Sequence, residues 1–266
     1  MWVALMTGVP QPCNPHLDIV TLKQPLKKLT ESLERRRKIR IVAIGSSSVA
    51  GEGVTIPFPA RLELALRNRY PGRMIDVLNR GIGGQEAPEE LTRFQDDVIA
   101  EDAALVIWQV GTNAIYRSLY EPSVVAGIVA TGLSWLKGLG PLGPDVILMD
   151  LQYAPVLFED DKGNPDPNKA GKTREMEWRL ADVAQHAEVN LFQRFQLMEQ
   201  WVKDGMNWDD LINKSDRVHM TEWSTACVTT ALDLASSLET FGQFFQWLLE
   251  GDDIDMGVAG LRDAGH

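Results

Sequence analysis

Short apolar segments alternate with amphipathic segments along most of this chain, and the alternation restricts the fold more than any other feature. Five strands are predicted, at Ile39–Ile44, Met74–Leu78, Ala104–Val110, Asp145–Leu151 and Val189–Phe192. Strands that are apolar on both faces are typical of a parallel sheet covered by helices on either side. We therefore expect an α/β protein, a three-layer α/β/α sandwich with a mostly parallel five-stranded sheet.

The segments between the strands predict the helices of the two outer layers. Their apolar residues recur at helical spacing, at Pro59–Tyr70, Ala87–Ala100, Val124–Leu139, Thr173–Ala187 and Glu222–Leu249. A long polar loop is expected over Ala154–Lys169, where helical periodicity is lost.

The two ends of the chain differ from its centre. Pro10, Pro12 and Pro15 predict an irregular arm up to residue 23, and a short basic amphipathic helix follows it. We expect the basic face of this helix to be solvated, with contact to an anionic surface as the alternative. The resulting division is an arm and basic helix at 1–37, one domain at 38–250 and a disordered acidic tail at 251–266.

Composition excludes some classes of function. The 266 residues carry a formal net charge of −11, which disfavours a nucleic-acid partner because such binding needs a basic surface. No apolar run is long enough to span a bilayer, so no transmembrane segment is expected. Neither clustered Cys and His nor an H-E-x-x-H motif is present, so we expect no metal and no cofactor. The oligomeric state does not follow from the sequence.

Three polar or glycine-rich motifs directly follow predicted strands, and ligands bind at this edge of a parallel sheet. Ser47 lies in the turn between Gly45 and Gly51, where a serine hydroxyl can be exposed as a nucleophile. The glycines ending at Gly84 and the amide of Asn113 are potential donors to a developing oxyanion. Each motif alone is also compatible with an ordinary turn.

A fourth motif precedes the last predicted helix. Asp216 and His219 are three residues apart, a spacing at which the carboxylate can bind the imidazole and fix its tautomer. Of the other three histidines, His16 lies in the irregular arm, His266 is the last residue, and His186 is expected at a helix surface or cap.

In this order, the four motifs resemble the blocks of the SGNH/GDSL hydrolase superfamily over about residues 38–248. The resemblance implies a flavodoxin-like SGNH fold with a catalytic triad of Ser47, His219 and Asp216. It also implies an oxyanion hole formed by the Ser47 backbone N–H, Gly84 and Asn113.

The sequence departs from the family pattern at two positions. Ser46 replaces the aspartate of the G-D-S signature, and Ala114 replaces the aspartate of G-x-N-D, which braces neighbouring loops in the family. Three adjacent serines leave Ser46 and Ser48 as alternative nucleophiles, although the register from Gly45 favours Ser47.

The resemblance predicts a serine hydrolase, a carboxylic ester hydrolase that acts through an acyl-enzyme. A short-acyl ester, such as an O-acetyl ester of a carbohydrate, is the expected substrate. Tyr153 follows the fourth predicted strand, where it either stacks on a sugar or packs internally. The alternatives are a non-catalytic module that binds a glycan or protein, and an O-acyltransferase on the same fold. Acyl length and the alcohol moiety stay open.

The two cysteines, Cys13 and Cys227, either form a disulfide that fastens the arm to the last helix or remain as two reduced thiols. The apolar start at Met1–Val9 is either a clipped export signal or a hydrophobic arm. A periplasmic or secreted location would permit the disulfide, and a cytoplasmic location is the alternative.

Overall fold

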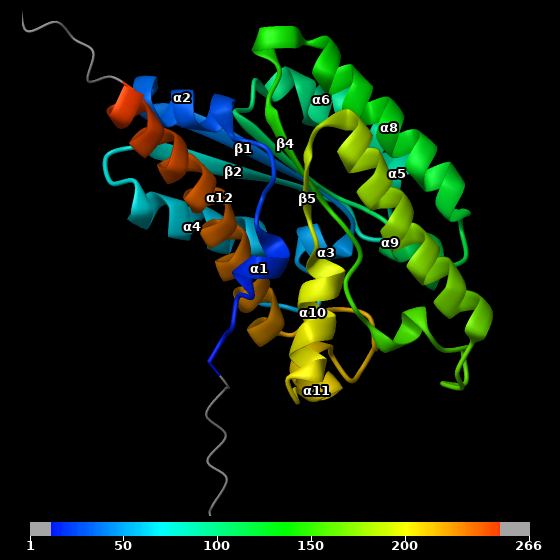
Figure 1. Ribbon diagram of the computed structural model, residues 1–266. Coiled ribbons are helices and arrows are strands. Elements are labelled where there is room, and N and C mark those ends of the chain that lie inside the picture. The colour runs from blue at the N-terminus through cyan, green and yellow to red at the C-terminus, as the bar shows by residue number, and fades with distance from the viewer. Residues whose placement is uncertain (1–11, 251–266) are drawn as a thin grey trace, which may run out of the picture.

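The computed structural model describes residues 12–250, with side chains described up to residue 237. The apolar start and the predicted acidic tail lie outside the described residues. The five predicted strands are present as one all-parallel sheet in the order β2-β1-β3-β4-β5 (Figure 1). They are β1 (Lys38–Gly45), β2 (Met74–Gly81), β3 (Leu105–Gln109), β4 (Asp145–Met149) and β5 (Asn190–Phe192).

Helices cover both faces of the sheet, as Figure 1 shows. One layer contains α5 (Ala87–Leu91), α8 (Pro122–Gly138) and α9 (Pro167–Ala187). The other contains α2 (Lys27–Arg35), α4 (Phe58–Arg69) and α12 (Glu222–Glu250). Every residue of β3 is buried because this central strand has a helix layer on each side. The predicted three-layer α/β/α sandwich is thereby confirmed.

The strand order reverses between β1 and β3. The chain goes from β1 outward to β2 and then returns across β1 to form β3 on its other side. The loops that leave the carboxyl ends of β1 and β3 therefore diverge, and such a switch point is where α/β sheets bind ligands.

Two predicted segments differ in the structure. The helix expected over Ala87–Ala100 is divided into α5, α6 (Phe94–Asp97) and a 3₁₀ turn, η1 (Ile99–Glu101). The break follows α5, where the Thr92 hydroxyl binds the Glu89 carbonyl and Arg93 reaches Gly45 at the end of β1. Local apolar spacing does not reveal these competing bonds.

The polar loop expected over Ala154–Lys169 is shorter than predicted. It contains η3 (Pro155–Leu157) and a bridge between Glu159 and Pro165. Helix α9 begins at Pro167 because Asp166 accepts the backbone N–H groups of two residues of its first turn. The first turns of α9 are polar, so apolar periodicity did not reveal them.

Further short elements were not predicted: α1 (Leu17–Val20), α3 (Ser47–Ala50), α7 (Thr112–Tyr116), η2 (Gly140–Leu142), α10 (Arg194–Lys203) and α11 (Trp208–Leu211). Helix α1 corrects the expectation of a wholly irregular arm. Its N-cap, His16, binds Asp204 at 2.7 Å, which places the arm beside the end of α10.

Of the two alternatives for the cysteines, the structure contains the disulfide. Cys13 in the arm is bonded to Cys227 on α12, and their Cα atoms are 5.5 Å apart. Cys227 is 2% exposed, as expected for a residue near the start of a packed helix. The Trp201 indole N–H also donates to the carbonyl of Asn14, so the arm is fixed to α10 as well as to α12.

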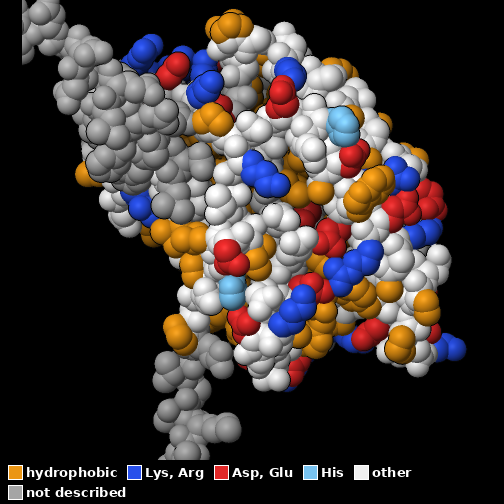
Figure 2. All heavy atoms as spheres, viewed as in Figure 1, with side chains coloured by type: hydrophobic (Ala, Val, Ile, Leu, Met, Phe, Trp, Pro, Cys, Tyr) orange, Lys and Arg blue, Asp and Glu red, His pale blue; other side chains and the backbone are white. Residues whose placement is uncertain are grey.

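Acidic and basic side chains are interspersed over the face of the molecule shown in Figure 2. Among the described residues, none of the helices combines the length and apolarity needed to cross a lipid bilayer.

Candidate active site

Ser47 is the first residue of α3, directly after β1. Gly45 ends the strand, and a Cβ there would lie 2.6 Å from Val49 and 2.9 Å from the Gln109 carbonyl, so the turn is too tight for a side chain. Gly51 ends α3 in the left-handed region at φ 99°. Two glycines thus allow a one-turn helix to begin where the strand ends, with Ser47 in its first position.

The three adjacent serines have different partners. The Ser46 hydroxyl donates to Gln109 Oε1 at 2.9 Å, and the Ser48 hydroxyl donates to Gln152 Oε1 at 2.6 Å. Among the described residues, no side chain binds the Ser47 hydroxyl. The two flanking serines therefore anchor the turn, and the central hydroxyl stays available for chemistry.

Asp216 and His219 are paired as the spacing predicts. Asp216 Oδ2 is 2.9 Å from His219 Nδ1, while Oδ1 accepts the backbone N–H groups of Val218 and His219 at 2.9 and 2.8 Å. Burial acts to raise the pKa of Asp216, but these hydrogen bonds outweigh it and hold the pKa below its usual value. The ionised carboxylate thus orients the imidazole so that Nε2 points away from it.

Three contacts bring the Ser47 turn and the His219 loop together. Gln152, 1% exposed, accepts from Ser48 and donates to the Val218 carbonyl at 2.5 Å. The Asn213 amide donates to Gly53 at 3.1 Å, on the turn that follows α3. Glu52, on the same turn, has Oε2 3.5 Å from His219 Nε2. His219 Nε2 therefore faces the turn that carries Ser47.

The two predicted oxyanion donors lie beside each other. Gly84 has φ 80°, in the left-handed region that favours glycine. The Asn113 side-chain amide donates to the carbonyl of Gln85, the residue after Gly84, at 2.8 Å. One of its two N–H groups is used in this bond, and the other remains for a ligand.

Tyr153 is half-buried in an aromatic cluster. Its ring stacks on Trp208 with centroids 4.7 Å apart and an interplanar angle of 21°, and its edge contacts are with Phe158 and Phe195. Trp208 also lines a hollow of about 150 Å³ with Asn213 and Arg217, in the segment that leads to Asp216.

Four polar residues that support the site were not identified from the sequence. They are Glu52, Glu86, Gln109 and Gln152, of which the last three are each 1% exposed. Gln109 gave one signal, since it is a polar residue at the end of an otherwise apolar strand. The others lie in loops, where a buried side chain has the same sequence signature as a solvated one.

The other described histidines lie elsewhere. His16 binds Asp204 in the arm, and the His186 side chain is 76% exposed near the end of α9, as predicted for a surface residue.

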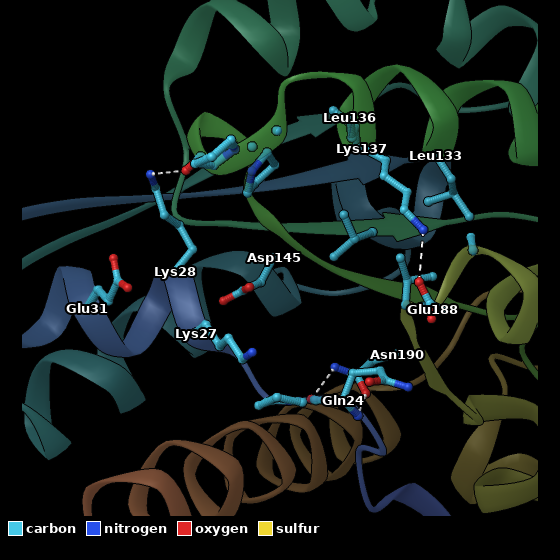
Figure 3. A pocket seen from close by; sticks show the side chains of 18 residues that line it. Gln24, Lys27, Lys28, Glu31, Leu133, Leu136, Lys137, Asp145, Glu188 and Asn190 are labelled. Carbon is cyan, nitrogen blue, oxygen red and sulfur yellow. Dashed lines mark hydrogen bonds and ion pairs between the residues drawn. The ribbon is translucent and has the colours of Figure 1, made fainter. Parts of the chain in front are cut away.

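A hollow lies at the opposite edge of the sheet from the predicted site residues. About 490 Å³ is enclosed between α2, α8 and the first residues of β4 and β5, with Asp145 and Asn190 at its base (Figure 3). It contains none of the predicted site residues.

Comparisons with known proteins agree with this fold. A model of the Non-GDSL lipase-like family matches residues 12–236. A search of the curated proteins found no match. An acetylxylan esterase from Geobacillus stearothermophilus shares 19% identity and a TM-score of 0.58, over 76% of this chain and 94% of that one. A two-domain esterase active on acetylated mannans shares 13% identity and a TM-score of 0.67, over 86% of this chain and 58% of that one.

Proposed function

The chain belongs to the Non-GDSL lipase-like family, and from this premise we propose that it is a serine hydrolase of the SGNH type that removes acetyl groups from a carbohydrate. Ser47, His219 and Asp216 form the catalytic triad of this proposal, and the Ser47 backbone N–H, Gly84 and Asn113 form the oxyanion hole.

One observation carries the proposal. Of three adjacent serines, only Ser47 has a hydroxyl that is not bound by another side chain among the described residues, and it starts the helix that faces the Asp216–His219 pair. A turn with a purely structural role does not need one serine hydroxyl without a side-chain partner, whereas a nucleophile needs a free hydroxyl.

The reaction proceeds in two acyl transfers. Ser47 Oγ attacks the ester carbonyl carbon while His219 Nε2 accepts its proton, and the same nitrogen then protonates the departing alcohol oxygen as its bond to carbon breaks. Water attacks the acyl-enzyme, gives a proton to His219 and releases acetate, and the proton returns to Ser47. Asp216 stays ionised and stabilises the imidazolium.

The oxyanion that forms in each step is bound by backbone and amide N–H groups. Gly84 and Asn113 lie on turns after β2 and β3, and each donor contributes roughly 3 kcal/mol to lowering the barrier. Glu52 Oε2 lies 3.5 Å from His219 Nε2, and because its side chain is 53% exposed it has room to move aside when an ester enters.

The carbohydrate part of the proposal draws on the structural neighbours and on the aromatic cluster. The Geobacillus esterase acts on acetylxylan, and variants of it described as catalytic mutants replace a serine, an aspartate and a histidine three positions after the aspartate. Asp216 and His219 have the same spacing. Trp208, supported from one side by Tyr153, is the surface we assign to a sugar ring.

A serine-directed probe combined with acetate release tests this function. A fluorophosphonate should label the protein once, and mass spectrometry should place the adduct on Ser47 rather than Ser46 or Ser48. The unlabelled protein should release acetate from acetylated xylan or mannan oligosaccharides and from p-nitrophenyl acetate.

Three results would overturn the proposal or part of it. A protein with neither adduct nor acetate release would be a binding module rather than an enzyme. Transfer of the acetyl group to an added sugar in place of water would make it an acyltransferase. Faster turnover of long-chain than of acetyl esters would exclude the proposed substrate class.

A further inference from the structure

Glu86 is a buried carboxylate that the proposed reaction does not use. It lies two residues after Gly84, at the N-cap of α5, and is 1% exposed. An unpartnered carboxylate in this position would be strongly destabilising, so its partners indicate its purpose.

Both oxygens of Glu86 bind backbone N–H groups, and two of the three donors belong to another part of the chain. Oε1 accepts from Gly111 at 2.8 Å and from Ala87 at 3.1 Å, and Oε2 accepts from Ala114 at 3.0 Å. Gly111 is the N-cap of α7 and has no side chain of its own to cap it. Glu86 therefore caps α7 from a distance as well as capping its own helix.

The two distant donors lie on either side of Asn113. Gly111 precedes Asn113 by two residues and Ala114 follows it, so the Glu86 carboxylate fixes the backbone around that residue. The Asn113 side chain is fixed from the same turn, because its amide donates to the Gln85 carbonyl. The turn that carries Gly84 and the turn that carries Asn113 are thus joined by three hydrogen bonds.

We propose, on the basis of the function proposed above, that Glu86 is the positioning residue of the oxyanion hole, holding Asn113 and Gly84 at the separation that the oxyanion requires. A displacement of about 1 Å between such donors can cost about 10²-fold in rate.

The charge environment agrees with a structural carboxylate. Burial raises the pKa of Glu86, and the three backbone N–H groups oppose that rise. Glu90, one helical turn later, is also buried, and burial raises its pKa well above the usual value. Its Oε2 accepts from the Trp108 indole at 2.7 Å, so it supports the sheet and not the Asn113 turn.

A double-mutant cycle on turnover of p-nitrophenyl acetate tests this role. Glu86→Gln should lower kcat by about 10²-fold with KM changed less than twofold, because an oxyanion donor acts on charge that exists only in the transition state. If Glu86 acts through Asn113, the pair Glu86→Gln and Asn113→Ala should be no slower than Asn113→Ala alone. If the kcat losses of the two single variants multiply in the double variant, the proposal is wrong, because multiplied losses mean that the two residues act independently.

Glu89→Gln is the matched control. Glu89 accepts the Glu86 backbone N–H in the capping box of α5 but binds neither Gly111 nor Ala114. This variant should lose stability without losing kcat. An equal loss of kcat would show that the helix cap, and not the Asn113 brace, controls the rate.

A crystal structure of the Glu86→Gln variant distinguishes failure of the positioning role from failure of the proposed function. The Asn113 amide should leave the Gln85 carbonyl, whatever reaction the protein catalyses, and an unmoved Asn113 turn would overturn the positioning role. If the glutamine variant does not fold, Glu86→Asp provides the same two readouts. A wild-type protein that is inactive, or an Asn113→Ala variant with full activity, would instead refute the proposed function.

Discussion

The two edges of the sheet hold polar groups for different purposes. At the carboxyl edge, Gln109, Gln152 and Glu86 are buried and hydrogen-bonded to loops, and no described side chain binds the Ser47 hydroxyl. At the amino edge, a hollow of about 490 Å³ is open, yet Asp145 at its base accepts the backbone N–H of Leu29 at 2.9 Å and so caps α2.

On the proposed assignment of the active site, the hollow of about 490 Å³ is not where the reaction takes place. The hollow is bordered by a carboxylate that already caps a helix, whereas the turn after β1 carries a serine hydroxyl that no described side chain binds. We propose that the reactive group is the one whose neighbours leave it without a side-chain partner. The following predictions test this, from the largest expected effect on turnover to the smallest.

Ser47→Ala should produce the largest effect. Removing the nucleophile should lower kcat on an acetyl ester by about 10⁴-fold or more. Ser46→Ala and Ser48→Ala remove anchoring hydrogen bonds only, so each should retain at least about a tenth of the activity. Comparable losses in all three would mean that the turn as a whole, and not one free hydroxyl, is required.

The pH dependence of kcat/KM should identify His219 as the base. Because the pKa of Asp216 is lowered, this carboxylate stays charged throughout an assay from pH 5 to 8. The base must be neutral to accept a proton, so activity should fall as the pH drops through the range in which histidines become charged. A profile that stays flat over this pH range would exclude a histidine base. His219→Gln should abolish turnover, whereas His186→Gln on the surface of α9 should not.

Trp208→Ala should affect the substrate and leave the chemistry intact. Loss of the stacking surface should raise KM for an acetylated oligosaccharide by about two- to tenfold, in line with about 0.5–1.5 kcal/mol for an aromatic contact. Turnover of p-nitrophenyl acetate, which has no sugar, should change little. If both substrates are affected equally, the Tyr153–Trp208 stack supports the His219 loop instead of a sugar.

Asp145→Asn should leave turnover unchanged and alter stability with pH. Burial raises the pKa of Asp145 from its usual 3.8 to about 6, so between these two pH values the folded state binds more protons than the unfolded state. The wild-type free energy of unfolding therefore loses up to about 3 kcal/mol from this group as the pH rises from 4 to above 6.

The asparagine variant lacks this loss. Its stability relative to wild type should increase over the same pH range, as measured by urea unfolding at matched pH values. A constant difference between the two proteins would show that Asp145 does not titrate there, and a fall in kcat would link the amino edge to the active site.

The sequence predicts the strands and the positions of the candidate site residues, because both follow from patterns among neighbouring residues. Apolar runs locate all five strands, and the glycines and polar residues directly after them locate Ser47, Gly84 and Asn113. The Asp216–His219 pair is also local, since three residues separate the two side chains. Helix α9 was misjudged at its start because a cap, and not periodicity, determines it.

The residues that support the candidate site could not be predicted from local sequence patterns, because their hydrogen-bond partners are distant in sequence. Gln152 joins Ser48, 104 residues before it, to Val218, 66 residues after it. Glu86 binds Gly111 and Ala114 across 25 and 28 residues. An isolated glutamine or glutamate in a loop has no signature that distinguishes such a role from exposure to solvent.

The Cys13–Cys227 bond spans 214 residues, and this span has a consequence for biosynthesis. The first cysteine is made long before its partner, and the sequence contains no third cysteine with which it could pair wrongly in the meantime. The bond can therefore close only after every strand of the sheet has been translated. A chain interrupted before residue 227 keeps a free thiol in its arm, so the oxidation state of Cys13 distinguishes chains that extend past residue 227 from shorter ones.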